Sequence, residues 1–126
     1  MNCLIDPQWA TEFAQEWIDS WNSHDLDRIL SHYSDDFEMK SPLILERIAG
    51  SQGCLKGKDK VAAYWRPSFS ATPPLRFELI DVLAGIDSVT LYYRSIGRRV
   101  VADTLLFNEQ GQVTKGMAQW SASSDQ

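Results

Sequence analysis

A run of four strand-like segments fills the second half of this chain, and it limits the possible folds more than any other feature. The segments cover residues 75–84, 88–96, 99–107 and 113–120, and short breaks containing Gly, Asp or Asn separate them. Because consecutive strands with short connections pair with each other, they predict an antiparallel meander. The first half of the 126 residues has helical patterns, and helices followed by strands indicate an α+β fold rather than an alternating α/β one.

Two amphipathic helices are predicted before the strands. Residues 7–22 place apolar side chains at three- and four-residue spacing, with Asp6 as the N-cap and Pro7 at the first helical position. After a polar break, a second apolar stripe begins at Leu26 and includes Tyr33. The short connection between the two predicts a helical hairpin.

The segment that joins this hairpin to the strands is less regular. Residues 37–41 alternate and predict a short strand that ends at Pro42. Residues 43–57 leave two interpretations open, a helical turn or a mobile flap, because glycines punctuate them. A third helix is expected to start near Lys58 and to end or kink at Pro67.

Composition limits the classes of function. Twelve Lys and Arg face seventeen Asp and Glu, so we expect no nucleic-acid partner and no membrane partner. No apolar run approaches the ~20 residues of a membrane span, and the first seven residues do not resemble a signal peptide.

The two cysteines have no CxxC spacing, and His24 and His32 are the only histidines, so we expect neither a metal nor another cofactor. His32 is expected to lie at the surface, away from any carboxylate. The sequence therefore predicts one cytoplasmic domain covering residues 1–126.

The most informative single residue is an acid in the third of the four strands. Asp103 shares a strand face with the apolar residues Val101 and Leu105. Burial among such neighbours raises the pKa of a carboxyl, because burial disfavours its charged form. A protonated carboxyl can donate a hydrogen bond to a developing oxyanion, so Asp103 is predicted to be an acid or an oxyanion donor.

The expected register of the neighbouring strand decides which side chain meets this acid. A two-residue type II′ turn at residues 97–98 pairs Tyr92 with Asp103 and Arg94 with Val101. Tyr92 is then a catalytic helper that forms a hydrogen bond with Asp103. The alternative is an ion pair between Arg94 and Asp103, which keeps the acid charged and gives it a purely structural role.

The chain is rich in aromatic side chains, with five Trp, five Phe and four Tyr. They either fill the core, as most buried aromatics do, or line a cavity for a flat apolar ligand. Both interpretations stay open. The aromatic candidates for a cavity wall are Phe13, Trp17, Trp21, Trp65, Phe69, Phe77 and Trp120.

Several motifs, in order, resemble those of the nuclear-transport-factor-2-like superfamily. They are residues 17–27 (WIDSWNSHDLD), 33–37 (YSDDF), 57–61 (GKDKV) and a closing pair, 103–108 (DTLLFN) with 111–113 (GQV). They cover nearly the whole chain and are most similar to the SnoaL-like and ketosteroid-isomerase-like branch. The resemblance implies a cone-shaped, curved mixed β-sheet wrapped on about three helices, also called a cystatin-like α+β roll. It further implies an apolar pocket in the cone and a homodimer through the outer sheet face.

Three positions of the ketosteroid-isomerase-like site can be matched to this chain. The position of the family's first donor, a Tyr, looks like Trp17, and that of its carboxylate base looks like Ser41. The second donor, four residues before Phe107, is Asp103. Since Ser41 cannot replace a carboxylate base, the match argues against steroid isomerase activity. The resemblance also places Trp17 and Trp120 at the wall or mouth of the pocket. The predicted ligand-binding residues are Phe13, Trp17, Ser41, Trp65, Val101 and Trp120.

Three functions are compatible with these residues. The first is an isomerase, cyclase or lyase acting on an apolar carbonyl compound, with Asp103 as the acid and Tyr92 or Trp17 as helper. An epoxide hydrolase needs an Asp–Arg–Asp arrangement, of which Arg94 and Asp103 supply only a part. The second function is a non-catalytic binder of small hydrophobic ligands. The third is a structural homodimer module whose cavity is filled by Trp side chains.

Two partners are expected. One is a small apolar molecule in the pocket, and the other is a second copy of the chain. Val100, Ala102 and Leu106 make the opposite face of their strand apolar as well, and a sheet that is apolar on both sides needs a second cover.

Overall fold

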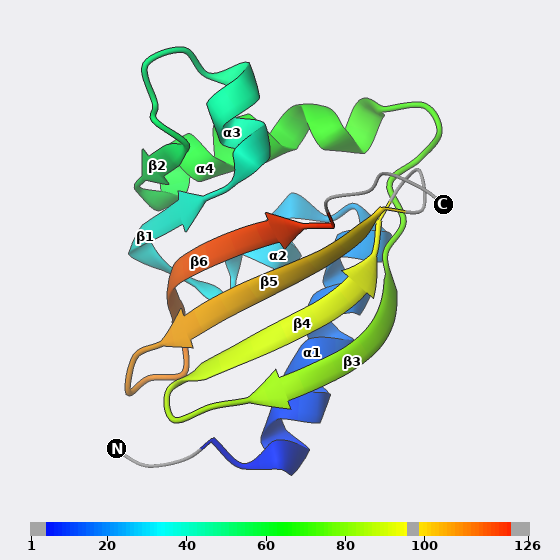
Figure 1. Ribbon diagram of the computed structural model, residues 1–126, viewed down its shortest axis with the longest axis vertical. Helices are drawn as coiled ribbons and strands as arrows, with labels where there is room; N and C mark the ends of the chain where they lie inside the picture. Colours follow the sequence, from blue (N-terminus) through cyan, green and yellow to red (C-terminus); the bar gives the residue numbers. More distant parts are fainter. Residues whose placement is uncertain (1–4, 96–98, 122–126) are drawn as a thin grey trace.

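The computed structural model describes residues 5–95 and 99–121. Within that part of the chain, a curved, unclosed six-stranded sheet packs against helices, which confirms the predicted α+β fold (Figure 1). No helix of the described ranges is long and apolar enough to cross a membrane. The elements are α1 (Pro7–Ser23), α2 (Leu26–Leu30), β1 (Tyr33–Lys40), α3 (Pro42–Arg47), β2 (Cys54–Lys56), α4 (Lys58–Trp65), the 3₁₀ helix η1 (Arg66–Ser70), β3 (Glu78–Ala84), β4 (Ser88–Arg94), β5 (Val100–Phe107) and β6 (Val113–Trp120).

The sheet is mixed, with strand order β2-β1-β6-β5-β4-β3. The predicted meander forms β3 to β6, and β1 joins it in parallel beside β6. Helix α1 lies behind β3 and β4, while α3 and α4 lie beyond β6, near β1 and β2 (Figure 1). Gly116 lets β6 approach its neighbours, because a Cβ there would lie 3.2 Å from both Leu105 and Phe37. The curvature leaves a concave inner face between these two helical groups.

The end of α1 is tied directly to the segment that leads into β3. The side chain of Asn22 donates to the carbonyl of Phe77 at 2.9 Å and accepts from its N–H at 2.7 Å. His24 ends the helix in a left-handed conformation, with φ 62°, and a ring nitrogen lies 2.8 Å from the carbonyl oxygen of Leu75. The motif at residues 17–27 therefore acts locally as a clamp that fixes Phe77 against α1.

Strand β1 starts earlier than the sequence pattern predicts. Helix α2 ends at Leu30, so Tyr33 is not part of it and instead opens the strand. Tyr33 is fully buried against Phe37, with ring centroids 4.5 Å apart. Packing on the inner sheet face has overridden the helical spacing that suggested a longer helix.

The ambiguous segment at residues 43–57 folds as the short helix α3 followed by the strand β2. Ser41 is the N-cap of α3, since its hydroxyl accepts a hydrogen bond from the N–H of Leu43 at 3.1 Å. Pro42 takes the first helical position, as proline does at a helix start. The helical-turn interpretation holds for the first part of the segment, while β2 was not predicted.

The register between β4 and β5 differs by one residue from the predicted one. Asp103 pairs with Leu91, and Tyr92 pairs with Ala102. The predicted turn at residues 97–98 lies outside the described residues. The last described pair closes with the N–H of Ser95 donating to the carbonyl of Arg99, so three residues rather than two separate the pair. A slip of one residue exchanges the two faces of a strand, which changes the neighbours of Asp103.

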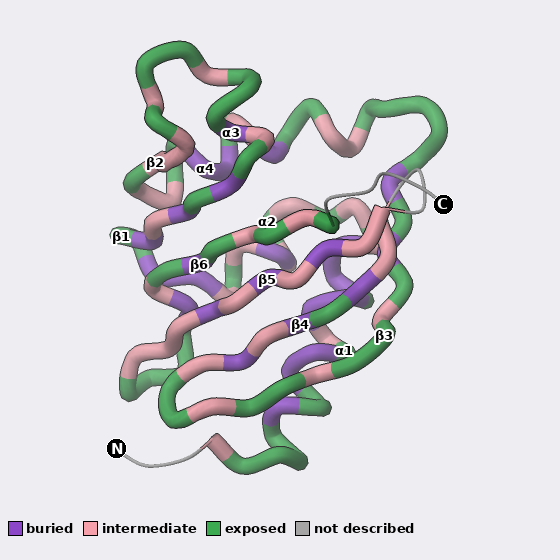
Figure 2. The backbone as a smooth tube through the Cα atoms, in the orientation of Figure 1, coloured by how far each residue is buried: buried purple, intermediate pink, exposed green. Residues whose placement is uncertain are grey.

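The alternation of burial along β5 places Asp103 inside. Val101, Asp103 and Leu105 are buried, whereas Ala102 and Thr104 between them are only partly buried (Figure 2). The sheet face that carries Asp103 is therefore the concave one that faces α1.

Candidate functional site

A cavity of about 660 Å³ lies between the inner face of the sheet and the helices α1, α3, α4 and η1. This volume is in the range of small-molecule binding pockets, and the cavity is partly open to solvent. Its wall is mostly apolar and aromatic. The lining residues are Trp17, Trp21, Tyr33, Met39, Ser41, Leu43, Arg47, Tyr64, Trp65, Pro67, Ser68, Ala71, Leu75, Phe77, Tyr93, Ser95, Arg99, Val101, Asp103, Leu105, Ala118 and Trp120.

Asp103 is the only acid among the described residues that line this cavity, and its side chain is almost fully buried, at 4% exposure. The hydroxyl of Tyr93 donates a hydrogen bond to Oδ2 at 2.6 Å. The second oxygen, Oδ1, has no hydrogen-bond partner within residues 5–95 and 99–121. Burial raises the pKa of Asp103 from 3.8 to about 6, and the Tyr93 hydrogen bond offsets part of that increase. Asp103 can therefore both give and take a proton near neutral pH.

The predicted partners of Asp103 were wrong, and the register explains why. Tyr92 faces away from the cavity with 39% of its surface exposed, whereas its neighbour Tyr93 is 5% exposed and points inward. Arg94 also lies on the outer face, where its Nε is 3.8 Å from Oε1 of Glu78. The ion pair between Arg94 and Asp103 does not form, so no guanidinium among the described residues holds Asp103 in its charged state.

Two further aromatic side chains bring polar groups to the inner wall. The indole N–H of Trp17 donates to the hydroxyl of Tyr33 at 2.8 Å, and both groups are buried. Burial raises the pKa of Tyr33, and burial together with the nearby Asp103 carboxyl raises the pKa of Tyr93. Both phenols keep their protons at neutral pH, so each is an uncharged hydroxyl. The indole N–H of Trp21 has no partner in the described chain and is a third potential donor.

Five of the six residues predicted to bind ligand line the cavity. They are Trp17, Ser41, Trp65, Val101 and Trp120. Phe13 does not, because it lies one helical turn before Trp17. Its ring stacks on Trp9 at 5.4 Å and meets Phe107 edge to face at 4.9 Å. Phe13 thus belongs to the core beneath the other end of the sheet.

Sequence patterns missed Tyr93 as a site residue and placed Tyr33 on the apolar stripe of a helix instead of on a strand. Tyr93 would have been found from the length of the β4–β5 connection, and Tyr33 from a strand that starts four residues earlier. No local signal distinguished the two tyrosines of β4, since adjacent positions of a strand face opposite sides.

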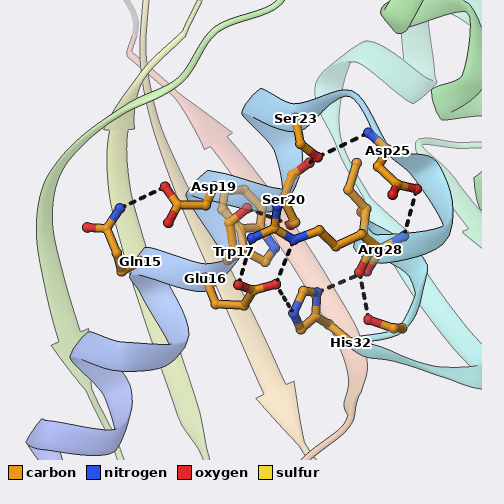
Figure 3. A network of polar contacts seen from close by, with 11 residues as sticks. Gln15, Glu16, Trp17, Asp19, Ser20, Ser23, Asp25, Arg28 and His32 are labelled. Carbon is orange, nitrogen blue, oxygen red and sulfur yellow. Dashed lines mark hydrogen bonds and ion pairs between the residues drawn. The ribbon is translucent and has the colours of Figure 1, made fainter.

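A separate polar cluster joins the two N-terminal helices outside the cavity (Figure 3). Arg28 donates to both carboxylate oxygens of Glu16, from Nε at 3.0 Å and from Nη2 at 2.9 Å. His32 lies beside the same carboxylate, with Nε2 3.5 Å from Oε2. The expectation that His32 lies away from any carboxylate was therefore wrong. This cluster connects α1 to α2 and contributes nothing to the cavity wall.

An open curved sheet that encloses an apolar cavity with one buried acid defines a class of small α+β pocket domains. Residues 14–123 match the family model of the SnoaL-like domain, and the chain belongs to this family. The predicted membership of the SnoaL-like branch is thereby confirmed. A comparison with curated proteins finds no match.

Solved structures support the same fold. A SnoaL-like protein of unknown function from Burkholderia thailandensis is 44% identical, covers 94% of this chain and 99% of its own, and superposes with a TM-score of 0.90. A candidate ketosteroid isomerase from Kribbella flavida is 12% identical, with coverage of 94% and 82% and a TM-score of 0.73. The epoxide hydrolase/cyclase-like enzyme SalBIII, which has a role in pyran ring formation in the polyether salinomycin, is 16% identical, with coverage of 94% and 95% and a TM-score of 0.71.

Proposed function

We propose that the cavity binds a small, mostly apolar carbonyl compound and that Asp103 acts on it as an acid or oxyanion donor. The reaction would be of the isomerase, cyclase or lyase type. The observation that carries this proposal is a buried carboxyl group that lines an apolar cavity and has one oxygen, Oδ1, without a partner in the described chain. A buried polar atom left unpaired costs stability, so a purely structural role does not account for it.

The chemistry depends on the protonation of Asp103 when ligand is bound. An apolar ligand displaces water from the cavity, which disfavours the charged carboxyl further. The carboxyl then carries its proton and donates it as a hydrogen bond to the carbonyl oxygen of the ligand. Such a donor stabilises the negative charge that develops on that oxygen in the transition state. Tyr93 acts as a positioning residue, because its hydroxyl fixes the rotation of the carboxyl through Oδ2.

Two further observations support this proposal. Four of the five tryptophans line the cavity and still leave about 660 Å³ free, which favours a ligand over a filled core. SalBIII and the candidate ketosteroid isomerase have the same fold, so the architecture is compatible with cyclase-like and isomerase-like activities. A non-catalytic ligand binder is the alternative, and the experiment below separates the two.

The test uses intrinsic tryptophan fluorescence, since Trp17, Trp65 and Trp120 line the cavity. The protein is titrated with steroids, terpenes and polyketide-like cyclic ketones, and ligands that change the fluorescence are then assayed for turnover. Asp103→Asn keeps the shape of the side chain but removes the acid. We expect it to keep ligand binding and to lose roughly 100-fold or more in turnover, the usual contribution of general acid catalysis.

The matched control is Asp87→Asn, which removes an exposed acid outside the cavity and should change neither property. Ligand binding by wild type without turnover of any compound would reject the catalytic role and leave a binder. Equal turnover in wild type and Asp103→Asn would reject proton transfer by Asp103, because the Asn amide still donates a hydrogen bond but cannot give up a proton. No fluorescence change with any compound class would reject the pocket function itself. The predicted homodimer and the predicted cytoplasmic location stay predictions.

A further inference from the structure

Two arginines line the mouth of the cavity, and one of them is held against its wall. Arg99 directly precedes β5 and lies two residues before Val101 on the inner face. Its guanidinium carbon is 4.4 Å from the centre of the Trp120 ring, a cation–π contact. Trp120 pairs with Val101 across β5 and β6, so this contact fixes the Arg99 side chain over the inner sheet face.

The second arginine reaches the mouth from the helical side. Arg47 lies in the last turn of α3 and lines the cavity together with Tyr64. The positive charge of Arg47 opposes the increase that burial causes in the pKa of Tyr64. The cavity is therefore lined by one guanidinium from the sheet side, Arg99, and one from the helical side, Arg47.

Neither of these guanidiniums has a carboxylate within ion-pair distance in the described chain. Among the other described arginines, Arg28 pairs with Glu16 and Arg94 pairs with Glu78, while the arginines at 66 and 76 have no such partner and do not line the cavity. The cavity thus carries two guanidiniums and one acid, Asp103, in a chain whose net charge is −5. Two arginines without an ion-pair partner in residues 5–95 and 99–121, both lining an apolar cavity, form a site of positive potential that an anion can neutralise.

We propose that the ligand of this cavity is an amphipathic anion. Its charged group, of the carboxylate kind, binds between Arg47 and Arg99, and its apolar body extends inward toward Asp103. The proposal rests on the proposed function in one respect only, that the same cavity holds the ligand. It does not require that Asp103 performs catalysis.

The spacing along β5 agrees with such a ligand. Arg99 and Asp103 are four residues apart on one strand face, so their Cα atoms are separated by roughly 13 Å at ~3.3 Å per residue. The ligand's anion is thus kept away from the buried carboxyl, so like charges do not meet. An elongated molecule can present an anionic end to the arginines and a carbonyl to Asp103 at the same time.

The experiment compares two dyes that share one aromatic body and differ in charge. Anilinonaphthalene sulfonate is anionic, and its parent compound N-phenylnaphthylamine is neutral. Affinities are measured from dye fluorescence with wild type and with the double variant Arg47→Gln and Arg99→Gln. We expect the double variant to bind the anionic dye about tenfold or more weakly, the loss typical of hydrogen bonds to charged groups, and the neutral dye with little change.

Three further measurements serve as controls for this comparison of the two dyes. Arg99→Lys keeps the positive charge and should retain most of the affinity for the anionic dye. Arg76→Gln removes an exposed arginine outside the cavity and should affect neither dye. Added salt should weaken binding of the anionic dye alone, because it screens the charges at the open mouth.

The outcomes separate this inference from the proposed function. If the double variant weakens both dyes equally, or neither, the anion site is wrong while a cavity that binds apolar molecules stands. If wild type binds neither dye, both proposals are overturned.

Discussion

Two carboxyl groups, Glu16 and Asp103, lie in surroundings that shift their pKa values in opposite directions. Glu16 lies on the outer side of α1, where Arg28 donates to both of its oxygens and His32 lies beside it (Figure 3). The hydrogen bond from Arg28 lowers the pKa of Glu16. Asp103 lies on the inner sheet face, where the uncharged hydroxyl of Tyr93 is its one side-chain hydrogen-bond partner among the described residues, and burial raises its pKa to about 6.

The difference shows what makes a carboxyl group structural and what leaves it available for chemistry. Arg28, which carries a full positive charge, holds Glu16 in the ionised state. The pair joins helix α1 to helix α2. A neutral donor stabilises the charged form of Asp103 less than burial destabilises it, so this carboxyl is half protonated near pH 6 rather than near its ordinary pKa of 3.8. The same residue class is thus used in two ways within one small domain.

The largest effect expected from this contrast is on the pH dependence of stability. The folded state keeps a proton on Asp103 up to about pH 6, while the unfolded state releases it near pH 3.8. The free energy of unfolding should therefore fall as pH rises from about 4 to about 6, by about 3 kcal/mol from this group, and stay level above that. Urea unfolding of wild type and Asp103→Asn across this pH range measures it, and the decrease should be absent in the variant.

Glu16 supplies the internal control for this measurement, because its contribution to the free energy of unfolding changes with pH in the opposite direction. Its pKa is lowered in the folded state, so its contribution to stability is present above its ordinary pKa of 4.5 and is lost as the pH falls below it. Glu16→Gln should keep the decrease between pH 4 and pH 6 that Asp103 causes. A pH profile unchanged by Asp103→Asn would show that this carboxyl is not buried in solution.

An intermediate effect is expected from the hydrogen bond that Tyr93 donates to Asp103. Tyr93→Phe removes the donor that favours the ionised carboxyl, so the pKa of Asp103 should rise above its present value of about 6. The loss of a hydrogen bond to a buried charge should cost about 1–3 kcal/mol at pH 8 and less at pH 4, where the carboxyl is protonated. Carbon NMR of the Asp103 carboxyl measures the pKa, and urea unfolding measures the stability.

Tyr92→Phe is the matched control, and it also tests the register of β4 and β5. Its hydroxyl is on the exposed face, so the variant should change neither the pKa of Asp103 nor the stability. The opposite result, a shift with Tyr92→Phe and none with Tyr93→Phe, would show that the strands pair one residue out of the register described above.

These variants also mark how far the sequence could predict the site. The meander and the inward position of Asp103 follow from patterns within single segments, and the structure confirms both. The partner of Asp103 depends instead on the connection between β4 and β5, where one additional residue turns Tyr92 outward and Tyr93 inward. A Gly-Arg pair suits a two-residue turn, but nothing local excludes a longer one.

Long-range packing decided the remaining errors. Tyr33 fits the apolar spacing of a helix and that of a strand equally well, and the space beside Phe37 selects the strand. His32 meets Glu16 because of the angle at which α2 returns along α1, which no spacing within either helix specifies. Phe13 shares the apolar stripe of Trp17 but lies one turn away from the cavity. Such contacts arise only when the elements are placed together.

The smallest effect is expected at the Glu16 cluster, although it has more polar contacts than Asp103. Glu16→Gln keeps the shape of the side chain and removes the charge that Arg28 and His32 share. Because the cluster is open to solvent, the loss of stability at pH 7 should be a small fraction of the Asp103 effect. It should also nearly vanish in ~1 M salt, where the screening length is about 3 Å. Glu12→Gln on the same helix, without an arginine partner in the described chain, should show no salt-dependent loss. A large loss that persists in salt would place Glu16 in a buried environment and remove the contrast with Asp103, whose buried charge salt cannot screen.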